Sequence, residues 1–122
     1  MDTHRVGRRF ETLAARWLEE RGWTVLDRNV RFQRREIDLV VRRGGTVAFV
    51  EVKGRRSDDR GHPLEAVTAR KRREIEAVAR WWVAHHGVGE REFRFDAVAV
   101  RAVGRSGRVA IEHVEGAWIM GE

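Results

Sequence analysis

Three residues whose side chains suit chemistry on phosphate groups lie close together in the sequence: Asp38, Glu51 and Lys53. Asp38 lies within an apolar stretch, and Glu51 and Lys53 end the next one. Paired carboxylates bind hard divalent cations through oxygen, and Mg²⁺ or Mn²⁺ suits such an all-oxygen pocket. An ammonium group beside the pair would hold a phosphate or the attacking water. The residue types therefore indicate metal-assisted phosphoryl chemistry.

A predicted β-hairpin brings these residues together. Its strands cover Glu36–Val41 and Thr46–Lys53, and Gly44-Gly45 predicts a two-residue turn. Such a turn fixes the register, which places Asp38 directly opposite Glu51. Opposed residues have Cβ atoms ~5 Å apart, and like charges there are destabilising. A compensating cation is therefore expected at this pair.

Alternation of side chains along the first strand of the hairpin predicts which face each residue occupies. Asp38 and Val40 are expected on one face of the sheet, and Ile37, Leu39 and Val41 on the other. On the second strand, Lys53 shares the face of Glu51. It is expected ~6.6 Å further along, at ~3.3 Å per residue.

The alternative interpretation of Glu51 and Lys53 is an exposed salt bridge, because the Glu-x-Lys pattern is common on strands. Three features favour chemistry. The strand around the pair is apolar on both faces, and a second carboxylate lies opposite. The cation is also a lysine, although the chain has 25 Lys and Arg residues of which only Lys53 and Lys71 are Lys. Lysine is a compact charge that can take part in proton transfer, whereas arginine stays protonated.

Composition limits the classes of protein to consider. The 122 residues, 42% of them hydrophobic, fit one domain spanning 1–122. The net charge of +6 favours a polyanion such as nucleic acid, although a basic surface also aids solubility. The absence of cysteine excludes disulfides and thiolate metal sites. With no apolar run near the ~20 residues of a membrane span, a cytoplasmic protein without membrane partners is expected.

The hydrophobic periodicity predicts two helices and five strands. The first helix covers Arg5–Arg21, and the second runs from Thr68 to His86 and ends at Gly87. The order of the elements along the chain is α-β-β-β-α-β-β. The long connection through the second helix allows strands three and four to pair in parallel. Besides the hairpin, the predicted strands are Trp23–Asn29, Phe93–Arg101 and Arg108–Val114.

The stretches Glu36-Ile37-Asp38-Leu39-Val40 and Phe49-Val50-Glu51-Val52-Lys53 resemble the D…(D/E)xK signature of the PD-(D/E)xK nuclease superfamily. The whole chain resembles the YraN-type family of bacterial predicted endonucleases, which is similar in fold to archaeal Holliday-junction resolvases. Further matching blocks are Gly7-Arg8-Arg9-Phe10-Glu11, Gly61-His62-Pro63-Leu64-Glu65-Ala66-Val67, Lys71 and Arg94-Phe95-Asp96. The chain departs from the family pattern at three positions. Arg35 stands where the family usually has Gly, and Ile37 replaces the signature proline. Phe10 stands where a small residue is common.

The resemblance implies an α/β, restriction-endonuclease-like αβββαβ core, with a mixed central sheet flanked by helices. It implies one or two divalent metals, Mg²⁺ or Mn²⁺, and hydrolysis of phosphodiester bonds in branched or structured DNA. Asp38 and Glu51, with the Val52 carbonyl, would hold the metal, and Lys53 would position the attacking water. The resemblance also implies that Glu11 contributes an acid, whereas its place beside the apolar stripe favours solvent exposure. The alternative is a non-catalytic nucleic-acid-binding adaptor that keeps the nuclease fold.

A group of basic residues around the second helix predicts a nucleic-acid contact. As a phosphate track these side chains would supply affinity without sequence recognition. The alternative is a solvated helix face with partners such as Glu74 and Glu76. The residues of this track are Arg55, Arg56, Arg70, Lys71 and Arg72.

Two further features have a structural interpretation. Asp96, in an apolar strand, is expected to cap a buried Arg or Lys71 rather than to join the site. Trp81 and Trp82 are consecutive and cannot both face one core, so one of them, or Trp118, is a candidate for a homodimer contact. Resolvase-like proteins need two active sites, which favours a homodimer.

Overall fold

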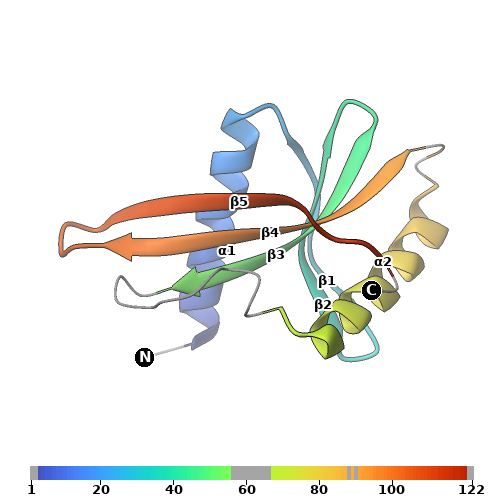
Figure 1. Ribbon diagram of the computed structural model, residues 1–122, viewed down its shortest axis with the longest axis horizontal. Coiled ribbons are helices and arrows are strands. Elements are labelled where there is room, and N and C mark those ends of the chain that lie inside the picture. Colours follow the sequence, from blue (N-terminus) through green and yellow to red (C-terminus); the bar gives the residue numbers. More distant parts are fainter. Residues whose placement is uncertain (1–2, 56–66, 88, 90, 121–122) are drawn as a thin grey trace.

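The computed structural model describes residues 3–55, 67–87, 89 and 91–120, and its element order is the predicted αβββαββ (Figure 1). This α/β arrangement agrees with a restriction-endonuclease-like core. The elements are α1 (Thr3–Glu20), β1 (Thr24–Phe32), β2 (Arg35–Arg43), β3 (Thr46–Arg55), α2 (Ala69–His86), β4 (Glu92–Val103) and β5 (Arg108–Trp118).

The five described strands form one mixed sheet in the order β1-β2-β3-β4-β5. Neighbouring strands are antiparallel except β3 and β4, which are parallel. The connection between these two passes through α2 (Figure 1). The predicted parallel pairing across a helical crossover is therefore confirmed.

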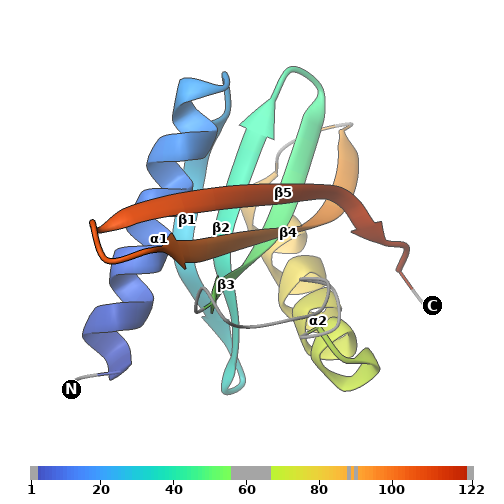
Figure 2. The same ribbon diagram turned by 60° about the vertical axis from the view of Figure 1, so that its left-hand side comes forward.

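The two helices cover opposite faces of the sheet (Figure 2). Each helix buries its apolar side against a separate core, so the sheet is apolar on both faces at its centre. The α1 side contains Ala14, Ala15, Leu18, Trp23, Leu39, Val41, Ala48, Val50, Val98 and Val100. The α2 side contains Val30, Ile37, Val40, Val47, Phe49, Val67, Ile75, Val78, Ala79, Trp82, Phe95 and Trp118.

Helix α2 begins and ends where the sequence predicts. The Thr68 hydroxyl accepts a hydrogen bond from the backbone N–H of Lys71 at 3.2 Å, which caps the first turn. Gly87 ends the helix with φ 52°, a left-handed conformation that glycine adopts without strain. The cap at Thr68 fixes Lys71 in the first turn of α2.

Strands β2 and β3 pair in the register predicted from their turn. The regular pairs extend from the Gly44-Gly45 turn as far as Leu39 with Val50. The next pair in this register would join Asp38 and Glu51, so these residues lie where the regular ladder stops.

Strand β2 is distorted at Asp38, which corrects the predicted alternation of side chains. Ile37 packs with Val40 in the α2-side core, whereas Leu39 and Val41 pack on the α1 side. The prediction that Ile37 shares a face with Leu39 is therefore wrong. Asp38 was predicted to share the face of Val40, but its carboxylate lies beside α1.

Two local features cause this distortion. Asn29 of β1, which would face Asp38 across the sheet, has φ 50° and leaves the extended conformation. The Asp38 carboxylate accepts the backbone N–H of Val52 at 2.7 Å, in place of a bond within the regular ladder. Because the Asp38 side chain bonds to the backbone of β3, it does not follow the alternation of side chains along β2.

No helix among the described residues is long and apolar enough to cross a membrane.

Candidate active site

Three carboxylates meet where β2 is distorted. One oxygen from each of Glu11, Glu36 and Asp38 lies within 4.8 Å of the other two. Glu11 comes from α1, and the other two come from β2. Because Asp38 also accepts a backbone hydrogen bond from β3, this acidic group is anchored to three elements of the fold.

The side chain of Asn29 joins two of these acids. With its amide nitrogen facing them, it donates to Glu11 at 2.7 Å and to Glu36 at 2.9 Å. The left-handed backbone of Asn29 brings its amide to this position. Glu36 also pairs with Arg31 across the β1–β2 turn at 3.3 Å, so one side of the acidic group is neutralised from the surface.

Glu51 lies on the other side of Asp38, together with both lysines of the chain. Its side chain is 4% exposed, and its Oε1 lies 3.4 Å from Lys53 Nζ and 3.8 Å from Lys71 Nζ. Glu51 Oε2 is buried and has no hydrogen-bond partner among the described residues. A buried carboxylate oxygen without a partner is costly and is a natural position for a bound cation.

Burial and mutual repulsion change the acidity of two of these carboxylates. Burial raises the pKa of Glu51 to about 7, and the charge of Asp38 adds to this effect against the two lysines. Burial likewise raises the pKa of Glu11 to about 7, with further contributions from Asp38 and Glu36. Asp38 therefore repels charge on both of its neighbours, and a cation at this point would stabilise all the ionised forms.

The residues predicted from sequence are distributed over two adjoining groups. Asp38 lies in the acidic group beside Glu11, whereas Lys53 accompanies Glu51. Glu51 is outside the close three-carboxylate group, although the charge of Asp38 acts on it. The structure adds Glu36, two residues before Asp38 in β2, to the acids.

The predicted phosphate track is not one continuous surface in the described residues. Lys71 reaches Glu51 inside the candidate site. Arg70 pairs with Glu74 at 3.5 Å, as expected for a solvated helix face. Arg72 donates to the Val67 carbonyl at 3.2 Å and lies over the ring of Trp118. The side chain of Arg55 and all of Arg56 lie outside the described residues.

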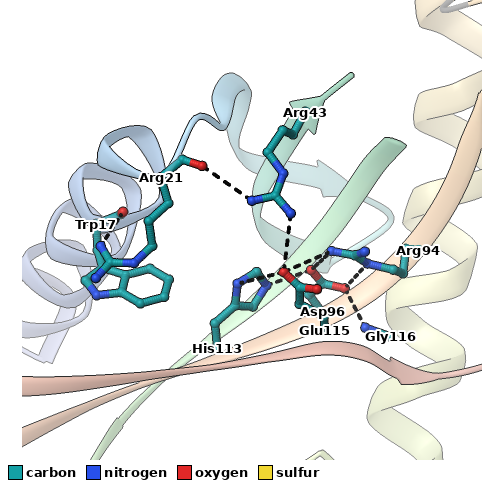
Figure 3. A network of polar contacts seen from close by, with 8 residues as sticks. All are labelled: Trp17, Arg21, Arg43, Arg94, Asp96, His113, Glu115 and Gly116. Carbon is teal, nitrogen blue, oxygen red and sulfur yellow. Dashed lines mark hydrogen bonds and ion pairs between the residues drawn. The ribbon is translucent and has the colours of Figure 1, made fainter. Parts of the chain in front are cut away.

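Asp96 has the structural role expected for it, and its cation is an arginine, one of the two predicted partners (Figure 3). Its buried carboxylate accepts two bonds from Arg94 at 2.9 Å, one from the Gly116 N–H at 2.9 Å, and contacts His113 at 2.7 Å. Burial alone would raise the pKa of Asp96, but these bonds from His113 and Arg94 hold it below its usual range. The buried cation is thus Arg94 and not Lys71.

The tryptophans considered for a homodimer contact all pack within the chain. Trp82 and Trp118 are buried, and Trp81 stacks on Phe32 with ring centres 5.4 Å apart. Next to Trp118, Ile119 and Met120 are exposed. A homodimer stays a prediction.

Comparison with known proteins identifies the family. The model of the uncharacterised protein family UPF0102 matches residues 10–100. The chain belongs to the UPF0102 family. This is the YraN-type family predicted from the sequence blocks, and the matched segment contains every carboxylate and lysine of the candidate site.

Curated UPF0102 proteins resemble the chain over most of its length. The UPF0102 protein of Prosthecochloris aestuarii is 42% identical over 119 residues, which cover 94% of each chain. That of Anaeromyxobacter dehalogenans is 45% identical, over 93% of this chain and 83% of its own. That of Beutenbergia cavernae is 45% identical, over 91% of this chain and 93% of its own.

The metal-free protein should become more stable as the pH falls from about 8 to about 5. The folded-state pKa values of Glu11 and Glu51, about 7, exceed the ordinary value of 4.5, so the folded state binds their protons more tightly. This stabilisation is fully present below 4.5 and is lost as the pH rises through 7. Thermal unfolding in EDTA should show a Tm about 5 °C lower at the higher pH.

The control for this pH effect is a pair of matched substitutions. Glu51→Gln removes one of the two titrating groups, so its Tm should depend less on pH than that of the parent. Glu74→Gln, on the outer side of α2, should keep the parent's pH dependence. A Tm that stays level or rises toward pH 8 would contradict the raised pKa values.

Proposed function

We propose that this UPF0102 protein is a divalent-metal-dependent endonuclease that hydrolyses phosphodiester bonds in branched or structured DNA. The observation that carries the proposal is the surrounding of Glu51. This buried carboxylate has one oxygen between two lysines and the other without a hydrogen-bond partner among the described residues, and the charge of Asp38, itself grouped with two further acids, acts on it. A salt bridge that only stabilised the fold would not need this excess of negative charge.

The residues fit a bound Mg²⁺ or Mn²⁺. The donor set consists of carboxylate oxygens, which these hard cations prefer. Asp38 and Glu51 would hold the cation, with Glu11 and Glu36 beside Asp38. A cation bound there supplies positive charge that stabilises developing negative charge on a phosphate and acidifies water. The raised pKa values of Glu11 and Glu51 support the same assignment, because they report carboxylates that lack sufficient countercharge.

The two lysines supply what the acids cannot. Lys53 and Lys71 have side chains about one-third exposed, so their ammonium groups can contact both Glu51 and an approaching phosphate. Lys53 is closer to the carboxylate and is suited to orient the attacking water. Lys71, in the first turn of α2, is suited to hold a non-bridging oxygen of the phosphate.

The experiment that tests the function is a cleavage assay on a panel of DNA substrates. Duplex, flap, fork and four-way junction DNAs are incubated with Mg²⁺ or Mn²⁺, and Asp38→Asn is the matched inactive variant. We expect cuts near the branch point by the parent and none by the variant. Binding of junctions without cleavage of any substrate on the panel would favour the adaptor and overturn the endonuclease.

Metal binding can be tested independently of cleavage. Addition of Mg²⁺ at about pH 8 should raise the Tm of the parent, because a ligand of the folded state stabilises it by mass action. The rise should be absent in Asp38→Asn. An equal rise in both proteins would show that the cation binds elsewhere.

DNA binding should depend on salt in proportion to the phosphates contacted. Each of Arg55→Gln, Arg56→Gln and Arg70→Gln is expected to reduce the slope of log K against log salt by about 0.9. Arg42→Gln, next to the Gly44-Gly45 turn, is the control and should leave the slope unchanged. Equal slopes for all variants would mean that these arginines do not contact DNA.

A further inference from the structure

A groove separates the first half of α1 from the β4–β5 hairpin. Its volume is about 370 Å³. Phe10 and Leu13 of α1 and Val109 of β5 supply apolar surface, and the turn of the hairpin adds glycines. Arg9 and Arg108 stand at its two walls. The groove therefore combines an apolar floor with a cationic rim.

The groove adjoins the candidate active site. Because β4 runs parallel to β3, with Lys53 opposite Ala99 and Gly54 opposite Val100, the hairpin continues beyond the end of β3 (Figures 1 and 2). The Phe10 ring lies against Gly54, where a Cβ atom would overlap it. Phe10 thus forms one wall of the groove and also touches the residue that follows Lys53.

The charge of the groove selects an anionic ligand. Arg9 and Arg108 are exposed, and neither forms an ion pair with any described residue. Two more exposed arginines, Arg8 and Arg105, flank them in the sequence. Among the described residues, no carboxylate lines the groove. Lone arginines around an apolar surface can bind the phosphates of a ligand while the floor contacts an apolar ring.

We propose that this groove binds unpaired nucleotides of a single-stranded DNA segment next to the phosphate that is cleaved. Paired bases in a duplex are stacked on each other and cannot reach an apolar floor, whereas unpaired bases are free to stack on Phe10 and contact Val109. The inference rests on the proposed nuclease function for its substrate. It explains how the chain would favour branched DNA, since flaps and forks offer unpaired bases beside a duplex.

The first test compares two oligonucleotides that differ only in their bases. Binding of a fluorescent 12-nucleotide oligothymidylate and of an abasic strand of equal length is measured by anisotropy in EDTA. Both carry the same phosphates, so electrostatic binding alone would treat them alike. We expect the parent to bind the oligothymidylate about tenfold more tightly, in the range of base stacking on aromatic side chains. Equal affinities would overturn the proposal.

The second test uses variants with matched controls on the same fold. Val109→Asp places an acid in the groove, and Arg108→Glu reverses the charge of its rim. Ile119→Asp is the control for the first, because Ile119 is an exposed β-branched residue that does not line the groove. Arg42→Glu is the control for the second, because Arg42 is an exposed arginine that does not line the groove. The Tm of each of the four variants is measured to check that it folds like the parent.

The groove variants should weaken oligothymidylate binding about tenfold, and the controls less than about twofold. Duplex of the same length should lose much less affinity in Val109→Asp. Equal losses for groove and control variants, or for single strand and duplex, would overturn the proposal. The readout needs no cleavage. Binding that depends on the groove, without cleavage of any substrate on the panel, would refute the nuclease function and support the nucleotide-binding groove. Cleavage by the parent, with binding unaffected by the groove variants, would support the nuclease function and refute the groove.

Discussion

Lys53→Arg should abolish metal-dependent cleavage while the fold and DNA binding persist. Arginine keeps the positive charge, so a role as the salt-bridge partner of Glu51 or as a phosphate anchor should survive the substitution. A role that needs a compact amine 3.4 Å from Glu51 is lost. The rate should fall by ~10²–10⁴-fold, which is the size of effect that a positioned proton-transfer group has.

The measurement is single-turnover cleavage at saturating Mn²⁺ on a substrate that the parent cuts. Lys71→Arg is the matched comparison, because it makes the same exchange beside the same carboxylate oxygen, 3.8 Å away. We expect a smaller loss from Lys71→Arg, since phosphate contact tolerates a guanidinium. Activity of Lys53→Arg equal to that of the parent would rule out the chemical role of Lys53.

Asp96→Asn should destabilise the protein far more than any substitution in the acidic group. The carboxylate is fully buried, accepts hydrogen bonds from Nε and Nη2 of Arg94 and from the Gly116 N–H, and contacts the His113 ring. Loss of its charge leaves Arg94 and His113 without their principal acceptor. Breaking a buried ion pair in this way costs ~3–5 kcal/mol, which corresponds to a Tm lowered by about 10–20 °C.

Glu115→Gln is the control for this prediction. Glu115 joins the same network (Figure 3), but its side chain is 47% exposed and its contact with Arg94 is 3.8 Å long. Exposed pairs of this kind contribute ~0–1 kcal/mol. Thermal unfolding at neutral pH should therefore separate the two variants clearly. Similar Tm values for both would show that the buried network does not hold β5 in place.

Most of the fold could be predicted from local patterns. Both helices, the Gly44-Gly45 turn and the parallel crossover follow from hydrophobic period, caps and connection length. All five described strands end later than predicted, for example β1 at Phe32 and β5 at Trp118. At most of these ends a charged residue or a glycine interrupts the apolar alternation, as Arg31 and Gly116 do. Paired backbone groups in a hairpin tolerate polar side chains, which hides those ends from a search for apolar alternation.

The distortion at Asp38 could not be predicted from the alternation of apolar residues. It depends on a side-chain bond from Asp38 to the Val52 N–H and on the left-handed backbone of Asn29. Neither has a signature within β2 itself. A sequence that reads as a continuous strand therefore contains a bend, and the bend directs Asp38 toward Glu11.

The contact between Lys71 and Glu51, which the crossover connection brings together, was equally hard to predict. Lys71 was assigned to a phosphate track from its basic neighbours, whereas it contacts Glu51. The connection between β3 and α2 decides where the first turn of α2 lies, and no local pattern specifies this. The rarity of lysine among the basic residues was the one signal that set Lys71 apart.

The sheet topology also has a consequence for how the chain folds. The four carboxylates come from α1, β2 and β3, which are joined by short connections. Contacts between near neighbours in the chain form early, whereas the parallel pairing of β3 with β4 must wait for closure of a long loop. We expect the contacts among these carboxylates to form before α2 brings Lys71 to Glu51.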